Sequence, residues 1–300
     1  MRTPKPLAAA KSVKQKAPSP KNARSAEKEV QDFDLLKLIA YGHRHLANQM
    51  LSKTPDLLLQ RSDVTDYSGR TFKNITAYDY AYWAKDTHAC RILEAHMTAA
   101  IKADMLKCCQ AIEQEGLSYE QYGQVIEHSK HFDFGPFIKA LEQYVAGYDR
   151  WLTTSDWKAI ESAWMMVGQA QRDVPVHVAH EYCRIDRAFH PTPTFDEEYL
   201  PENLTIFNYK TEQEEVWFPL GSSDASGLGI NFGIVFAGRG SRKCYVVRGP
   251  NEGNKCWDYI ARWLAWRDTA GGDVDLAAIQ HLDAVRTADL KQSLDNLRLV

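Results

Sequence analysis

The residues best suited to chemistry lie in the segment VPVHVAHEYCRIDRAFHP, residues 174–191. If this segment is helical, Cys183 lies one turn from His180, with Asp186 close behind in the sequence. A histidine within hydrogen-bond reach of a cysteine raises the fraction of thiolate, which is the nucleophilic form of the side chain. Cys183, His180 and Asp186 are therefore the candidate catalytic residues of a cysteine-dependent enzyme.

The same segment offers ligands for a metal ion. On a helix, His177, His180 and Glu181 would share one face, and two imidazoles with a carboxylate or thiolate can hold zinc. However, no second ligand cluster with standard spacing completes a four-ligand shell. Valines also alternate over residues 174–178, a pattern typical of a strand, which would separate these side chains. The question of an enzyme stays open, but the segment favours buried structural polar residues, and we expect no metal and no cofactor.

A second candidate is the glycine-rich stretch GSSDASGLGINFG, residues 221–233. Backbone N–H groups of such loops can bind phosphate, so a phosphate- or nucleotide-binding protein is an alternative. A dinucleotide fingerprint needs a strand before the glycines and a helix after them. Both flanks here have the composition of strands, which favours an ordinary hairpin loop.

Charge is distributed unevenly along the 300 residues. The net charge is −3, yet residues 1–28 carry eight Lys or Arg against the single acid Glu27, so the remainder carries about −10. An acidic body does not provide the many cationic contacts of an extensive nucleic-acid surface. The tail itself has almost no large apolar residues, and we predict that it is disordered.

Cysteine usage and hydropathy indicate the compartment. The six cysteines form no CxxC pair, no secretory signal precedes them, and no apolar run is long enough to span a bilayer. We therefore predict reduced thiols, no membrane span and a cytoplasmic location.

The hydrophobic pattern from residue 33 to residue 98 predicts four short helices in two pairs. Between the pairs, DYSGRT at residues 66–71 predicts a turn, with Gly69 available for a positive φ. The distance from Leu35 to Ala77 is roughly 40 residues, as in a helical repeat.

This segment resembles a pair of ankyrin repeats. TAYDYA at residues 76–81 stands where that family has its T-P-L-H-x-A helix opening, and Gly42-His43 matches the G-H between its two helices. The segment departs from the family pattern in three ways. Ala77 and Asp79 replace the Pro and His of the helix opening, and Asp86 stands where Gly is usual. Residues 72–75 also make the loop longer. Two repeats alone bury little surface, so they must pack against the domain that comes after them.

The rest of the chain predicts an α+β fold. We expect the ankyrin-like helical pair, a helical middle region that includes SYEQYGQVIEHS, and a small antiparallel β-sheet in a meander, covered by C-terminal helices. The predicted divisions are a disordered basic tail (1–30), ankyrin-like repeats (31–100), a helical region (101–190), and the β-meander with its helices (191–300).

The resemblance implies a protein–protein interaction module or adaptor. Its architecture is similar to that of ankyrin-containing effectors delivered by type IV secretion in intracellular bacterial pathogens, which would place a host protein as the partner in a host cytosol. Ankyrin repeats bind through their loops and inner helices, and an exposed tryptophan is a common contact residue. The expected partner-binding residues are Asp66, Tyr67, Arg70, Phe72, Lys73, Tyr78 and Trp266.

Overall fold

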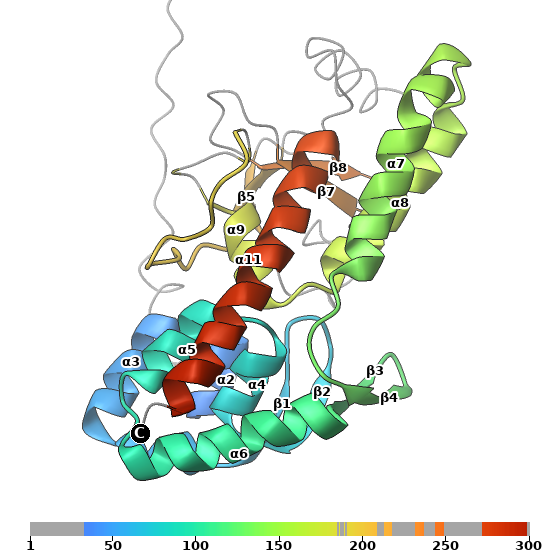
Figure 1. The fold of residues 1–300 in the computed structure, drawn as a ribbon. Helices are drawn as coiled ribbons and strands as arrows, with labels where there is room; N and C mark the ends of the chain where they lie inside the picture. The colour runs from blue at the N-terminus through green and yellow to red at the C-terminus, as the bar shows by residue number, and fades with distance from the viewer. Residues whose placement is uncertain are drawn as a thin grey trace, which may run out of the picture. The chain divides into compact units, whose positions relative to one another are not determined.

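The computed structural model describes residues 33–184, 186, 189, 191–208, 213–217, 232–236, 244–248 and 272–298 (Figure 1). The chain divides into two units, Met1–Asp34 and Leu35–Val300, and the second unit contains every helix and strand of these described residues. The predicted tail over residues 1–30, the loop residues 221–231 and Trp266 lie outside the described residues.

The first part of this unit consists of two pairs of short helices with a β-hairpin between them. Helix α2 packs against α4, and α3 packs against α5, so the pairs lie side by side. The predicted order of helices and turn is confirmed, and the connecting segment is paired strand rather than loop. The elements are α2 (Leu35–Ala40), α3 (Arg44–Lys53), the 3₁₀ helix η1 (Pro55–Leu59), β1 (Ser62–Thr65), β2 (Thr71–Ile75), α4 (Ala77–Trp83) and α5 (Thr87–Glu94).

Local capping explains two of the departures from the ankyrin pattern. Asp79 forms a capping box with Thr76: the Asp79 N–H donates to Thr76 Oγ1 at 3.0 Å, and the Thr76 N–H donates to Asp79 Oδ2 at 2.9 Å. Asp86 caps α5, since its Oδ1 accepts from the Ala89 N–H at 3.0 Å. Both carboxylates therefore start helices that the sequence alone predicted.

The middle region is less helical than predicted. Residues 117–129 form a β-hairpin rather than a helix, because side chains alternate from Leu117 to Gln121 and the turn residues Tyr122 and Gly123 both have positive φ. The remaining elements of this region are helical, as expected. In chain order, the region contains α6 (Ala99–Glu115), β3 (Leu117–Gln121), β4 (Gln124–Ser129), α7 (Gly135–Thr153), α8 (Trp157–Arg172) and α9 (Val176–Tyr182).

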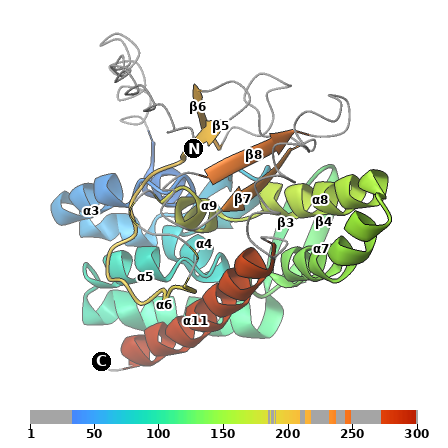
Figure 2. The same cartoon turned by 90° about the horizontal axis from the view of Figure 1, so that it is seen from above.

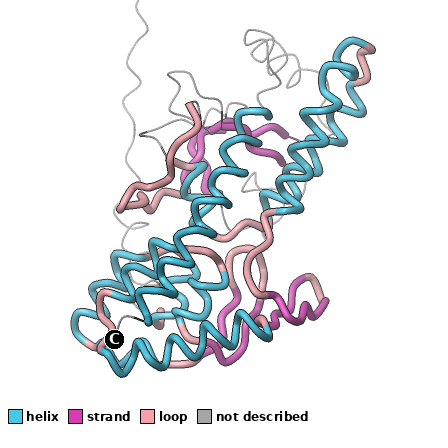
Figure 3. The backbone as a smooth tube through the Cα atoms, viewed as in Figure 1, coloured by secondary structure: helices cyan, strands magenta, loops and turns pink. Residues whose placement is uncertain are grey.

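The two hairpins join into one antiparallel sheet in the order β1-β2-β3-β4, drawn in magenta in Figure 3. Register places Phe72 opposite Tyr119, and Tyr119 opposite Ile126. Phe72 is buried against Trp83 of α4, with ring centroids 4.8 Å apart. This row of side chains fixes the sheet on the second helix pair.

The four strands predicted in the C-terminal part are present, but they do not form a meander. Their order is β6-β5-β8-β7, with β5 parallel to β8, so two hairpins associate side by side. The sequence predicts each hairpin from its local pattern, whereas the pairing between hairpins joins residues far apart in the chain. The strands are β5 (Thr205–Asn208), β6 (Gln213–Val216), β7 (Phe232–Phe236) and β8 (Cys244–Arg248).

Helix α11 (Gly272–Arg298) brings the C-terminal part back to the beginning of the unit. It packs against α7, α6 and α5. Figures 1 and 2 show it, in red, as a long helix that passes from beside the C-terminal strands to the helices of the first part. The fold is α+β, as predicted. None of the described helices is long and apolar enough to cross a membrane.

Candidate functional site

Helix α9, with the sequence VHVAHEY, is the centre of a buried polar cluster. Every residue from Val176 to Tyr182 is buried, including His177, His180 and Glu181. The segment is helical, so these three polar side chains come from one short element, as the helical interpretation of the sequence required. Their partners come from distant parts of the chain.

Arg44, the first residue of α3, joins three of these parts. Its Nη1 donates to Asp86 Oδ2 at 3.2 Å, while its Nη2 donates to His180 Nδ1 at 2.8 Å and to the Leu200 carbonyl at 3.2 Å. A guanidinium has only donors, so Nδ1 of His180 is the acceptor and carries no proton. Arg44 therefore joins three elements: α3, to which it belongs, α9 through His180, and the N-terminus of α5 through Asp86.

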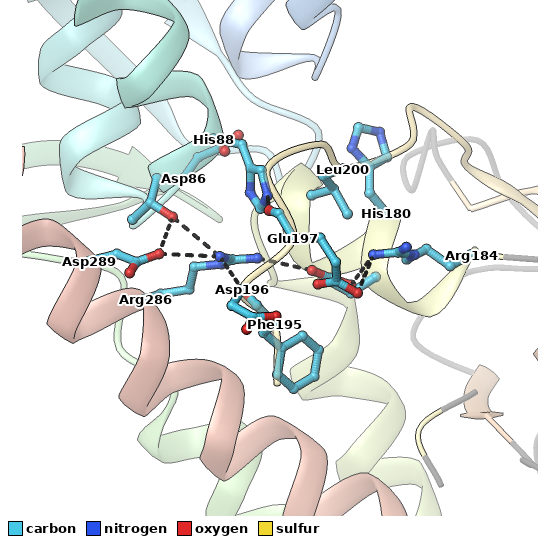
Figure 4. Close-up of polar contacts among 12 residues, drawn as sticks. Asp86, His88, His180, Arg184, Phe195, Asp196, Glu197, Leu200, Arg286 and Asp289 are labelled. Carbon is cyan, nitrogen blue, oxygen red and sulfur yellow. Dashed lines mark hydrogen bonds and ion pairs between the residues drawn. The ribbon is translucent and has the colours of Figure 1, made fainter. Parts of the chain in front are cut away.

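Arg286 of α11 makes the corresponding connection from the other side. Its Nη2 donates to Glu181 Oε1 at 3.0 Å, and its Nη1 donates to Thr87 Oγ1 at 3.3 Å and to the Phe195 carbonyl at 3.1 Å. The side chains of Arg286 and Glu181 are both 0% exposed. Figure 4 shows the Arg286 side chain reaching from α11 toward this cluster.

The turn between α4 and α5 receives further contacts from α11. Lys85 Nζ donates to Asp283 Oδ1 at 2.7 Å, and Thr87 Oγ1 donates to Asp289 Oδ2 at 3.2 Å. Arg91 Nη2 also donates to Asp289 Oδ2 at 2.6 Å. Helix α11 thus holds the interhelical turn of the second pair at several points.

Burial determines the charge states within the cluster. Desolvation, assisted by the nearby Arg286 and Arg44, lowers the pKa of His177 to about 4 and that of His88 to about 3. Burial and Arg44 also lower the pKa of His180 well below its ordinary value. Burial alone would raise the pKa of Asp86, but its neighbours, Arg44 among them, together lower it. At neutral pH the histidines are therefore neutral, and Asp86 pairs with Arg44.

Gly42 permits the close approach of the first interhelical turn to α9. It has φ +77°, and a Cβ placed on it would lie 2.4 Å from His180 Cε1. Any other residue therefore meets both backbone strain and a clash. In this chain, the close contact with His180 and the positive φ both require a glycine at position 42.

We expect Gly42→Ala to lower the free energy of unfolding by about 2–4 kcal/mol, since a positive φ costs about 1 kcal/mol and overpacking a further 1–3. Urea unfolding followed by tryptophan fluorescence measures the loss. Gly69→Ala is the matched control: Gly69 has φ +79°, but nothing lies within 4 Å of its added Cβ. If both variants lose the same free energy of unfolding, the added methyl group at position 42 has no steric cost against His180, and the prediction is wrong.

The predicted catalytic set does not assemble. Nδ1 of His180 is bound to Arg44, and Asp186 accepts two hydrogen bonds from Arg184, at 2.9 and 2.6 Å. Cys183 ends α9 as a buried residue. The three candidates are neighbours in sequence, but His180 and Asp186 are bound to arginines, and burial keeps a substrate from the thiol. Among the residues that the structure describes, no group of three His, Cys, Asp or Glu could hold a metal ion.

Four of the predicted partner-binding residues are buried: Asp66, Arg70, Phe72 and Tyr78. Arg70 points inward, where its guanidinium lies 5.5 Å from the Trp83 ring centroid and donates to the Asp173 carbonyl at 2.6 Å. Their inclusion in an exposed contact surface is therefore wrong, because these side chains fasten the hairpin to the helices. Lys73 is exposed, and Tyr67 is half-buried, with its ring stacked on Tyr41 at 4.2 Å.

The residues that sequence reasoning missed are mainly Arg44, His88 and Arg286. Arg286 carried a signal: it falls in register with the buried positions Ile279, Leu282 and Leu290 of α11. A cation at a core position of a helix predicts a buried anion opposite it.

Comparison with known proteins gives the family. The family model described as the CBUA0006 C-terminal domain matches residues 136–297, from the start of α7 to the end of α11. The chain is 36% identical over 277 residues to the uncharacterized protein CBUA0006 of Coxiella burnetii (strain RSA 493 / Nine Mile phase I), covering 88% of this chain and 74% of that protein. No solved structure matches the chain. The chain therefore belongs to the CBUA0006 family.

Proposed function

We propose that this protein is a protein-interaction module in which two ankyrin-like helix pairs support a binding surface on the β3–β4 hairpin. The observation that carries the proposal is the exposure of three large apolar side chains within five residues. Tyr122 is 59% exposed, Val125 66% and Ile126 37%. Val125, opposite Glu120, and Ile126, opposite Tyr119, are consecutive strand residues and point to opposite faces of the hairpin. Exposed apolar residues gathered at one hairpin are typical of a segment that a partner encloses.

The hairpin is held in a fixed position, which favours binding. Tyr122 Oη donates to Asp173 Oδ1 at 2.6 Å, and the Arg172 guanidinium lies 4.4 Å from the Tyr122 ring centroid. Gln121 Nε2 donates to the Ser68 carbonyl of the β1–β2 turn at 2.9 Å. A preorganised surface loses little conformational entropy when a partner binds, so more of the contact energy appears as affinity.

The sheet places the hairpin at the end of a continuous row of side chains. Phe72 is buried, Tyr119 beside it is half-buried, and Ile126 at the edge is exposed. A partner that covers Ile126 would extend this row. The hairpin surface takes the place of the buried residues that the sequence predicted to make the contact. Of those predicted residues, Lys73 of β2 is exposed.

The partner in this proposal is a protein in the cytosol of a host cell. The ankyrin-like arrangement, joined to a domain of a different kind, is similar to that of secreted bacterial effectors. The relative CBUA0006 comes from Coxiella burnetii, a bacterial source with which that proposal agrees. A partner of known identity would determine both the location and the biological role.

The proposal is tested by quantitative affinity capture from a eukaryotic lysate. Tyr122→Ala combined with Val125→Ser is expected to reduce capture of the specific partner about 30-fold, since loss of an aromatic hot spot costs roughly 2 kcal/mol. The control, Leu152→Ser with Met166→Ser, changes exposed apolar residues on α7 and α8 and should retain the partner. Equal capture by both variants at equal melting temperature would discard the hairpin surface.

A further inference from the structure

The segment over residues 191–204, here called the strap, crosses the buried cluster without forming a helix or a strand. It is held at several points. The Leu200 carbonyl accepts from Arg44, the Glu197 carbonyl accepts from His88 Nε2 at 2.8 Å, and Glu202 Oε1 accepts from the His45 N–H at 2.7 Å. The side chain of Leu200 is also buried. The strap is therefore fixed at these points, and its course bends at Glu198 and has a positive φ at Phe195.

Tyr199 lies between these anchoring points with its side chain facing solvent. It is 68% exposed, and within the described part of the chain its hydroxyl has no hydrogen-bond partner. Most other tyrosines with described side chains are buried or half-buried. Tyr122 is also exposed, but its hydroxyl binds Asp173. Tyr199 is thus the described tyrosine whose phenol is most accessible to an external catalyst.

The residues around Tyr199 carry a specific charge pattern. Asp196, Glu197 and Glu198 precede the tyrosine directly, and Leu200-Pro201 follows it. Asp196 and Glu198 are exposed. Protein kinases use the charge pattern around the acceptor hydroxyl to choose among substrates. Acidic residues on the N-terminal side suit a kinase with a basic substrate groove.

We propose that Tyr199 is a phosphorylation site for a protein tyrosine kinase that accepts acidic residues before the tyrosine. The phenol oxygen attacks the γ-phosphorus of ATP, the bond to the β,γ-bridging oxygen breaks, and ADP leaves. The phenolic proton passes to the catalytic aspartate of the kinase. The product carries a charge of about −1.5 to −2, which an arginine-lined phosphotyrosine pocket of a partner can bind.

This inference goes beyond the hairpin surface, since the two involve different residues and different chemistry. The test uses the full chain, a purified Src-family kinase catalytic domain and ATP, with mass spectrometry to locate the phosphate. We expect close to one phosphate per chain on Tyr199. Tyr199→Phe should abolish this phosphate, whereas Tyr122→Phe should leave its amount unchanged.

A synthetic peptide of residues 193–205 shows whether the kinase accepts the sequence. Phosphorylation of the peptide without phosphorylation of the folded chain would overturn the proposal, because it would mean that the strap hides the tyrosine. Failure of both would overturn the charge-pattern argument. Incorporation that persists in Tyr199→Phe would assign the phosphate to another residue and also contradict the proposal. Melting temperatures of wild type and Tyr199→Phe should agree, since the side chain is exposed.

Discussion

Replacing Arg286 with methionine is expected to lower the free energy of unfolding by about 3 kcal/mol. The change removes the Arg286 guanidinium, which donates to the buried carboxylate of Glu181 at 3.0 Å, and breaking a buried ion pair from one side typically costs 3–5 kcal/mol. Arg184 remains in the vicinity, but its Nη1 lies 3.9 Å from Glu181 Oε2, too far for a hydrogen bond. Urea unfolding, followed by the fluorescence of buried Trp83 and the other tryptophans, measures the loss.

Two further variants show that the loss comes from the pair. Glu181→Leu combined with Arg286→Met removes both charges, and it should recover at least half of the stability, because apolar replacements of a buried pair are often neutral. Lys291→Met changes an exposed cation of the same helix and should change stability by less than about 0.5 kcal/mol. The single variant Glu181→Leu completes the cycle. A double variant that loses as much stability as the two single variants together would show no coupling between α9 and α11.

Stability is expected to fall steeply between pH 6.5 and pH 4. The unfolded chain binds a proton at each histidine near pH 6.5, whereas the folded-state pKa is about 4 for His177 and about 3 for His88. The folded state therefore binds fewer protons in this window, and acid favours unfolding. At pH 5 each of these two histidines should remove roughly 2 kcal/mol of the stability present at pH 7.

Burial is the largest cause of the lowered histidine pKa values, and charged neighbours modify them. Arg44 and Arg286 oppose protonation of His177, while Asp86 favours it. Asp86 has a lowered pKa in the folded state, so the unfolded chain takes up this proton first, and the stability that Asp86 contributes is lost mainly below about pH 4. It therefore adds to the loss only at the acid end of this window.

Denaturant titrations at half-unit pH intervals measure the dependence. His177→Gln should reduce the slope between pH 6.5 and pH 4 by about one proton, because glutamine does not titrate. His45→Gln, at an exposed position of α3, should leave the slope unchanged. A profile that stays flat from pH 7 to pH 5 would contradict the assignment of buried neutral histidines.

Local patterns predicted most of the secondary structure. The two helix pairs, α11 and the four C-terminal strands follow from apolar spacing and turn residues, which act over a few neighbouring positions. The helical prediction for SYEQYGQVIEHS was wrong because 3–4 spacing of apolar residues coincided with a strand alternation. The dipeptide Tyr122-Gly123 was the available turn signal, and it marks the tip of the hairpin.

The candidate site was less predictable, because its partners are far apart in the sequence. His180 and Glu181 were identified as polar residues of one helix, but Arg44 is 136 residues from His180 and Arg286 is 105 residues from Glu181. Residue types alone could not distinguish a reactive histidine from one held by an arginine. The same holds for Arg70, which the sequence placed on an exposed loop and the fold places among aromatic rings.

Helices α9 and α11 together hold the interhelical turns of both helix pairs, and we expect these elements to form one cooperative unit. Hydrogen exchange followed by mass spectrometry, comparing wild type with Arg286→Met, tests this most directly. We predict that peptides covering α4, α5, α9 and α11 lose protection together and by similar factors, since local openings coupled to one network share one free energy. Loss of protection confined to α11, with α4 and α5 unchanged, would contradict the cooperative unit.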